Sequence, residues 1–249
     1  MANEMYSSKM TIIEHLEELR KRIILSLVFF LGASIFSFVF VDRISAVLRL
    51  PAVGVIDTFI FTAPTEIFTT YFRLAMLSGF IISLPFILFQ LGAFLMPAVP
   101  ADKKEAIASW LIMSFALSML GIMFSYFIAL PFALKFLISF AEGAALPMIA
   151  IGKYFSFAGA FLLIGAGIFQ IPVIMALLSY IGMLSTKFFS QNRKYAIVVI
   201  AIISAIITPT QDIFNMLIFA VPMWALYETG ILASWIIERR RKHEARINI

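Results

Sequence analysis

Long apolar stretches without charge constrain this chain most strongly. A helix needs about 20 consecutive apolar residues to cross the hydrocarbon core of a bilayer. Six runs of this kind lie near residues 23–41, 74–96, 107–130, 156–181, 195–208 and 213–237. They are continuous and lack the alternation of polar and apolar residues that membrane barrel strands require. The sequence therefore predicts an all-α, polytopic membrane protein with six transmembrane helices.

The overall composition agrees with a membrane protein and excludes several classes of site. The chain is 62% apolar and 13% charged, whereas about a quarter of the residues in soluble domains are charged. Cysteine is absent, which excludes disulfides and thiolate metal sites, and we expect no metal or other cofactor. The net charge of +5 is typical of loop charges that orient membrane helices, so no nucleic-acid partner is expected.

The distribution of basic residues predicts the orientation. If both termini are cytoplasmic, the cytoplasmic segments carry 14 of the 19 Lys and Arg residues. These segments are residues 1–22, 97–106, 182–194 and a basic tail at 238–249. The positive-inside rule then places both ends in the cytoplasm. We expect residues 1–249 to form a single membrane domain.

Two features of the spans are irregular. The fifth run, YAIVVIAIISAIIT, has about 14 residues and reaches about 21 Å, against a core of about 30 Å. Either the bilayer thins there, or this end of the protein is shallow in the membrane, or the run is simply a short helix packed against its neighbours. Proline in or beside four runs predicts kinks, because each proline removes a backbone hydrogen bond. These residues are Pro85, Pro131, Pro172 and Pro222.

The charged segment before the first span has the pattern of a helix. Thr11 followed by Glu14 forms a capping box, and the apolar residues after it share one face. This pattern predicts an amphipathic cytoplasmic helix that runs into the first span. Two opposite-charge pairs at i,i+4 would stabilise it, namely Glu17 with Lys21 and Glu18 with Arg22. Either the charges satisfy one another or one carboxylate binds a cationic ligand such as a peptide arginine.

The order of motifs along the chain resembles the TatC family of the twin-arginine translocase. The matching stretches are HLEELRKRI at 15–23, APTE at 63–66, LPFILFQLGAFLMPA at 84–98, GIFQIPV at 167–173, TPTQD at 208–212 and AVPMWALYETG at 220–230. The resemblance covers nearly the whole chain, in order.

The resemblance implies a receptor and core scaffold of the Sec-independent pathway, which exports folded proteins using the proton-motive force. It implies a concave bundle in the cell (inner) membrane, twin-arginine signal peptides as ligands, and single-span TatA- and TatB-like partners in an oligomeric complex within the lipid. The alternative function is a secondary transporter of a small solute. Sparse midplane charge and the lack of a visible repeat argue against that alternative. No enzyme motif such as HExxH or GxSxG is present, so we expect no catalytic activity.

The family's arginine-binding residues are carried over position by position. The acidic residue of the family's N-terminal motif corresponds to Glu18, and Arg20 is expected to orient the local charges. A second acidic group belongs in the following cytoplasmic loop, which reads PAVPADKKEA here. Lys103 occupies the position where the family has Glu, so either Glu105 or Asp102 must substitute.

Three polar or aromatic residues within the apolar runs have two readings each. Phe94 either packs against the signal peptide or is an ordinary aromatic side chain. Gln170, where the family often has Glu, either binds a partner or inserted helix or bonds a neighbouring helix. Glu228 is an ionisable residue within the sixth run, so it is either functional or paired near the interface.

Three further residues match family motifs and are expected to have structural roles. Glu66 should organise the outer loop, Asp212 should cap the sixth helix, and Pro85 lies inside the second span. His15 lies in the matched N-terminal motif, but no second histidine is placed to form a metal site.

Overall fold

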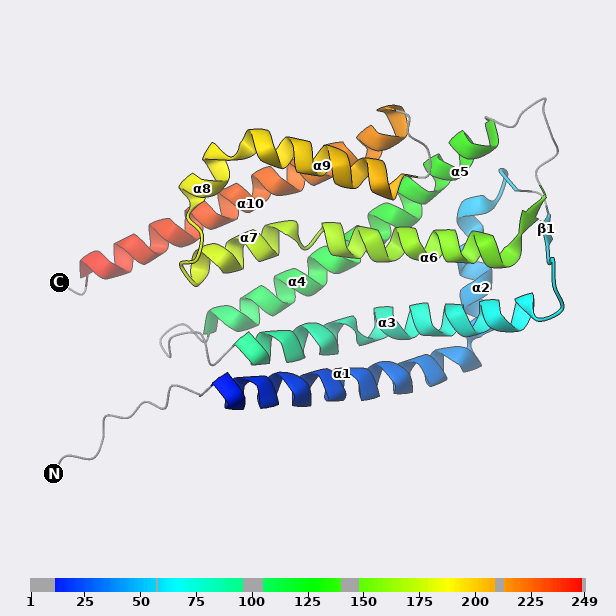
Figure 1. Ribbon diagram of the computed structural model, residues 1–249, viewed down its shortest axis with the longest axis horizontal. Coiled ribbons are helices and arrows are strands. Elements are labelled where there is room, and N and C mark those ends of the chain that lie inside the picture. The colour runs from blue at the N-terminus through cyan, green and yellow to red at the C-terminus, as the bar shows by residue number, and fades with distance from the viewer. Residues whose placement is uncertain (1–11, 57, 96–104, 140–147, 209–212, 248–249) are drawn as a thin grey trace. The chain divides into compact units, whose positions relative to one another are not determined.

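Helices make up nearly all of the described structure. The computed structural model describes residues 12–56, 58–95, 105–139, 148–208 and 213–247 (Figure 1). Within these ranges the side chains of residues 12, 95, 105–108, 214–215 and 240–247 are not described. The all-α prediction is confirmed.

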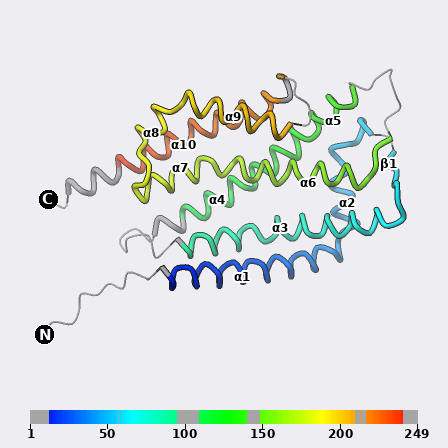
Figure 2. The backbone as a smooth tube through the Cα atoms, viewed as in Figure 1, coloured from blue at the N-terminus to red at the C-terminus, as the bar shows by residue number. Residues whose placement is uncertain are grey.

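The described residues form ten α-helices, and Figure 2 traces the course of the backbone through them. They are α1 (Ile12–Val39), α2 (Val41–Arg49), α3 (Glu66–Leu95), α4 (Glu105–Phe124), α5 (Leu130–Ser139), α6 (Ile151–Ile168), α7 (Ile171–Tyr180), α8 (Thr186–Gln191), α9 (Arg193–Ile207) and α10 (Ile213–Ile247). A 3₁₀ turn (Leu50–Ala52) follows α2, and a π-helical turn (Ser125–Ala129) joins α4 to α5. Two short strands, β1 (Phe59–Ile60) and β2 (Ile149–Ala150), pair in parallel.

Five helical stretches among the described residues are long and apolar enough to cross a membrane. They are Ile13–Val39, Glu66–Phe94, Ser109–Ser139, Ile151–Tyr180 and Met216–Arg239. The predicted fifth span corresponds to α9, whose 15 residues give about 22 Å at the helical rise. The chain is thus a polytopic α-helical membrane protein, while the sixth crossing and the side of each terminus stay predictions.

The chain divides into two compact units, each described separately below. Unit 1 comprises Met1–Ile44 and Tyr71–Phe115, and unit 2 comprises Ser45–Thr70 and Ala116–Ile249. In unit 1, α1 lies alongside α3 (Figure 1), with Phe29 stacked on Phe86 at a centroid distance of 4.4 Å. The backbones approach closely at Gly79, where a Cβ would collide with Ser34 Oγ and lie 2.6 Å from Ser34 Cα. Glycine is therefore required for this packing.

In unit 2, α10 packs against α7, α8 and α9. A hydrophobic cluster of Met175, Phe189 and Ile231 joins α7, α8 and α10. Helix α7 ends in a Schellman motif, because Gly182 has a positive φ of 82° and its N–H donates to the carbonyl of Ser179. This arrangement turns the chain sharply from α7 towards α8.

Unit 2 also contains a close helix crossing, between α4 and α6. A Cβ on Gly165 would collide with Ser125 Oγ and lie 2.5 Å from the carbonyl oxygen of Gly121. Small residues let membrane helices approach in this way. Ser125 begins the π-helical turn, so the helix winding changes at the crossing itself.

Two helices continue beyond the predicted spans, and the structure shows how the prolines are accommodated. The helical stretch of the third span continues past residue 130 to Ser139, because the π-helical turn precedes Pro131 and the helix resumes as α5. Helix α10 likewise continues past residue 237 to Ile247. Pro172 stands in the first turn of α7, after a break at Phe169–Gln170. Pro85 and Pro222 lie inside continuous helices.

Candidate functional site

The face of α1 that meets α3 carries Glu18 and Arg22, which are one helical turn apart. Glu18 Oε1 and Arg22 Nη2 are 2.5 Å apart, and their side chains are 25% and 23% exposed. Arg22 Nη1 also donates to Gln90 Oε1 on α3 at 2.9 Å. Gln90 is only 7% exposed. The carboxylate, the guanidinium and the amide therefore form a continuous polar chain between the two helices.

An aromatic pair lies on the same helix faces. His15 stacks on Phe94 with a centroid distance of 4.4 Å and an interplanar angle of 20°. His15 precedes Glu18 by three residues, and Phe94 follows Gln90 by four, so each pair shares one side of its helix. Phe94 is therefore engaged in the α1–α3 contact next to Glu18.

Arg20 makes no ion pair with Glu18 among the described residues, and its predicted role stays a prediction. Arg20 is exposed and lies two positions from Glu18, which on a helix points away from it. Arg22, at i+4, forms the ion pair instead. Of the two pairs predicted on α1, the described residues form Glu18–Arg22, and no ion pair joins Glu17 to Lys21.

The second acidic group of the predicted arginine site cannot be placed beside Glu18. Asp102 lies outside the described residues. Glu105 is the first residue of α4, but its side chain also lies outside the described part of the chain. The α1–α3 surface thus supplies one carboxylate that already accepts a guanidinium donor.

Gln170 in unit 2 faces a neighbouring helix. Its Nε2 atom donates to Ser118 Oγ on α4 at 2.6 Å, and Ser118 is 2% exposed. Gln170 occupies the break between α6 and α7, one turn beyond the Gly121–Gly165 crossing. Because an amide in hydrocarbon is costly unless bonded, this hydrogen bond explains how the residue is tolerated.

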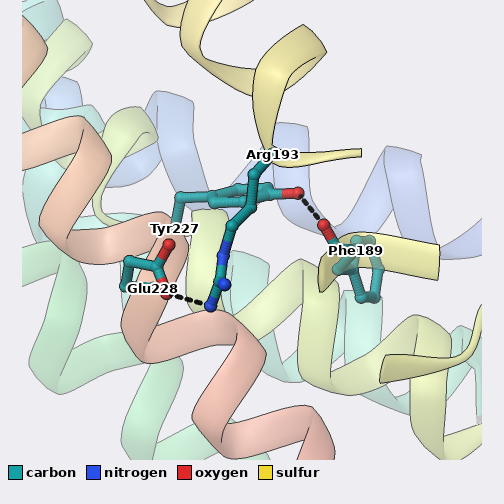
Figure 3. A network of polar contacts seen from close by, with 4 residues as sticks. All are labelled: Phe189, Arg193, Tyr227 and Glu228. Atoms are coloured by element: carbon teal, nitrogen blue, oxygen red, sulfur yellow. Dashed lines mark hydrogen bonds and ion pairs between the residues drawn. The ribbon is translucent and has the colours of Figure 1, made fainter. Parts of the chain in front are cut away.

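Glu228 on α10 pairs with Arg193 at the start of α9 (Figure 3). Glu228 Oε2 lies 2.8 Å from Arg193 Nη2, and the two side chains are 32% and 47% exposed. The neighbouring Tyr227 donates its hydroxyl to the carbonyl of Phe189 at 2.7 Å. The two contacts hold α10 against the α8–α9 segment. The carboxylate of Glu228 is thus paired, which is the second of the two roles that the sequence allows for it.

Glu66 at the start of α3 organises the segment before it. Its carboxylate accepts hydrogen bonds from Thr62 N at 2.5 Å, Thr62 Oγ1 at 2.8 Å and Gly152 N at 2.9 Å. These contacts join the segment before α3 to the first turn of α6. Asp212, the predicted cap of the sixth helix, lies outside the described residues. No cluster of three or more potential metal ligands occurs within the described part of the chain.

Comparison with known proteins identifies the family. The family profile described as Sec-independent protein translocase protein (TatC) matches residues 14–222. A TatC protein of Carboxydothermus hydrogenoformans is 34% identical over 94% of this chain and 96% of its own length. The TatC protein of Aquifex aeolicus is 35% identical over 94% and 98%. A crystal structure of a twin arginine translocase receptor, TatC, superposes with a TM-score of 0.78 at 34% identity. The superposition covers 90% of this chain and 100% of the chain in that crystal structure. The chain therefore belongs to the TatC family of Sec-independent protein translocase proteins.

Proposed function

We propose that this protein is the signal-peptide receptor and core scaffold of a twin-arginine translocase in the cytoplasmic membrane. In this proposal, Glu18 binds an arginine of the signal peptide at the cytoplasmic end of α1. An acidic residue of the 97–106 loop, Glu105 or Asp102, binds the second arginine. Folded cargo then crosses the membrane with the proton-motive force, and the protein itself catalyses no covalent step.

The single observation that carries this proposal is the guanidinium seated on Glu18. The guanidinium of Arg22 reaches the carboxylate of Glu18 and at the same time contacts Gln90 on α3. The carboxylate is therefore accessible to a guanidinium at the α1–α3 surface. Guanidinium–carboxylate pairs are stronger and more directional than pairs with an ammonium group. A site built around such a carboxylate suits arginine better than lysine. Phe94 and His15 provide adjacent aromatic surface for the peptide's apolar part.

The proposed partners are TatA- and TatB-like single-span proteins. Helix α9 supports a membrane-helix partner, since it is short and exposes a row of apolar side chains. These are Ile197, Val198, Val199, Ile202, Ile203 and Ile206. Gln170 and Glu228 are proposed as contacts for such partners, although both already have bonds within the chain.

A small-solute transporter remains the rival function, and the described contacts favour it less. Transporters gather ion and substrate ligands at broken helices near the bilayer midplane. The break between α6 and α7 offers Gln170, an uncharged residue that is already bonded to Ser118. Of the two ion pairs among the described residues, one lies near the start of α1, and the other joins the start of α9 to Glu228 in the middle of α10, where the carboxylate is already paired with Arg193.

A peptide-binding measurement tests the proposal. The full chain in lipid nanodiscs is titrated with a labelled peptide that carries adjacent arginines before an apolar stretch, and with the matching Lys-Lys peptide. We expect the Arg-Arg peptide to bind more tightly. Glu18→Gln should weaken Arg-Arg binding by about five- to tenfold or more, because a partly buried carboxylate–guanidinium bond is lost.

Glu17→Gln is the matched control. It removes the same charge one residue away, at an exposed position, and should change the affinity much less than Glu18→Gln does. Equal binding of the two peptides would contradict the receptor function. Equal effects of the two substitutions would contradict the assignment of Glu18 alone.

A further inference from the structure

The pairing of Glu18 with Arg22 has a consequence for ligand binding. An arginine arriving from a signal peptide does not meet an empty carboxylate, since Arg22 already contacts Glu18 Oε1 through Nη2. We propose that Arg22 is an intramolecular competitor that occupies the signal-peptide site, and that Gln90 holds Arg22 when the ligand displaces it. This inference rests on the proposed function.

The contacts of Arg22 show a guanidinium that is held but incompletely satisfied. One terminal nitrogen binds Glu18 and the other binds Gln90 on α3. The Nε atom is buried and has no hydrogen-bond partner. A peptide guanidinium that approaches Glu18 from outside is free of this constraint and can bind the carboxylate through two parallel N–H groups. The incoming group can therefore form the better contact.

Gln90 gives Arg22 a place to remain after displacement. Its Oε1 atom accepts from Nη1, whereas Glu18 contacts Nη2. Loss of the Glu18 contact therefore leaves the Gln90 contact intact. Arg22 needs only a small side-chain rotation, and no buried cation is left without an acceptor, which would be costly.

Competition of this kind lowers the affinity for every cationic ligand by the same factor. The apparent affinity falls in proportion to the fraction of molecules whose Glu18 is free of Arg22. The pair is largely but not fully buried, and pairs of that kind reduce the free fraction by about two- to fivefold. Arg22 thus lowers the apparent affinity of the site for both peptides by the same factor. The ratio of the Arg-Arg and Lys-Lys affinities does not change.

The test measures Arg-Arg and Lys-Lys peptide affinities for Arg22→Gln, Arg22→Lys and Lys21→Gln in nanodiscs. Lys21 is exposed, and Lys21→Gln removes the same charge from the same helix. This variant therefore reports the general electrostatic effect of losing one cation. We expect Arg22→Gln to tighten binding of both peptides by about two- to fivefold beyond Lys21→Gln. Arg22→Lys should lie between wild type and Arg22→Gln.

Combination with Glu18→Gln provides the decisive comparison. In that background Arg22→Gln should give no gain beyond Lys21→Gln, because there is no carboxylate left to release. Weaker binding in folded Arg22→Gln, or a gain equal to that of Lys21→Gln, would overturn the inference. If Arg22→Gln fails to fold, an Arg22→Lys protein no tighter than wild type overturns it equally. Failure of the wild-type protein to distinguish the two peptides would instead overturn the proposed function.

Discussion

Replacement of Gly165 by alanine should weaken the packing of α4 against α6. The added Cβ would collide with Ser125 Oγ and lie 2.5 Å from the carbonyl oxygen of Gly121. The backbone oxygen cannot move away without shifting the helix, and overpacking of this kind costs about 1–3 kcal/mol. The better helix propensity of alanine stabilises the folded state by about 0.8–1 kcal/mol relative to glycine. The expected net effect is a loss of stability of up to about 2 kcal/mol.

Gly167 is the matched control on the same helix. A Cβ there would have nothing within 4 Å, so alanine should retain only the propensity gain of up to about 1 kcal/mol. Thermal unfolding of the purified protein, followed by circular dichroism, measures both variants. Each 1 kcal/mol shifts the midpoint by about 2–4 °C in a chain of this size. The two substitutions should move the midpoint in opposite directions.

Ser125→Ala in the Gly165→Ala background refines the test. It removes the hydroxyl that the new Cβ would strike, but the carbonyl of Gly121 stays in place. The double variant should therefore recover part of the lost stability. A Gly165→Ala protein as stable as Gly167→Ala would refute the close-crossing argument.

Three further outcomes follow from the described contacts. Gly79→Ala should lower the unfolding midpoint by a few degrees through overpacking against α1, while Gly32→Ala, with nothing within 4 Å, should not. A double-mutant cycle on Arg193 and Glu228 should give a coupling energy of no more than about 1 kcal/mol, since both side chains are substantially exposed; a larger value would show a stronger network. Gln170→Leu should lower stability by at least about 0.6 kcal/mol, a typical interhelical hydrogen bond in membranes, and unchanged stability would contradict a stabilising bond to Ser118.

Hydropathy alone predicted the helical class because the bilayer leaves few other ways to satisfy backbone polar groups. Exact helix ends were harder to predict. The third apolar run ends at residue 130 in the sequence prediction, whereas the helix continues through the π-helical turn and past Pro131 to Ser139. The short helices α2 and α8 were not predicted. Their apolar content is too low for a search for long apolar runs to find them.

The candidate site was only partly predictable from residue types. Glu18 and Phe94 came from family motifs, and the i,i+4 rule predicted the Glu18–Arg22 pair. Gln90 was missed, although an amide within an apolar run is the same signal that singled out Gln170. The contact of Arg22 with Gln90 joins positions 68 residues apart, and helical periodicity cannot reveal such a pairing.

Photo-crosslinking from the signal peptide tests directly whether the peptide's arginine pair binds beside Glu18. A peptide with a photoreactive residue beside its arginine pair is bound to the full chain in nanodiscs and irradiated, and the crosslinked fragments are identified by mass spectrometry. We expect crosslinks in the 12–22 segment of α1 that unlabelled Arg-Arg peptide suppresses better than Lys-Lys peptide. At a subsaturating peptide concentration, Glu18→Gln should reduce these crosslinks severalfold and Glu17→Gln should not. Crosslinks confined to other segments, or unchanged in Glu18→Gln, would contradict a receptor site at Glu18.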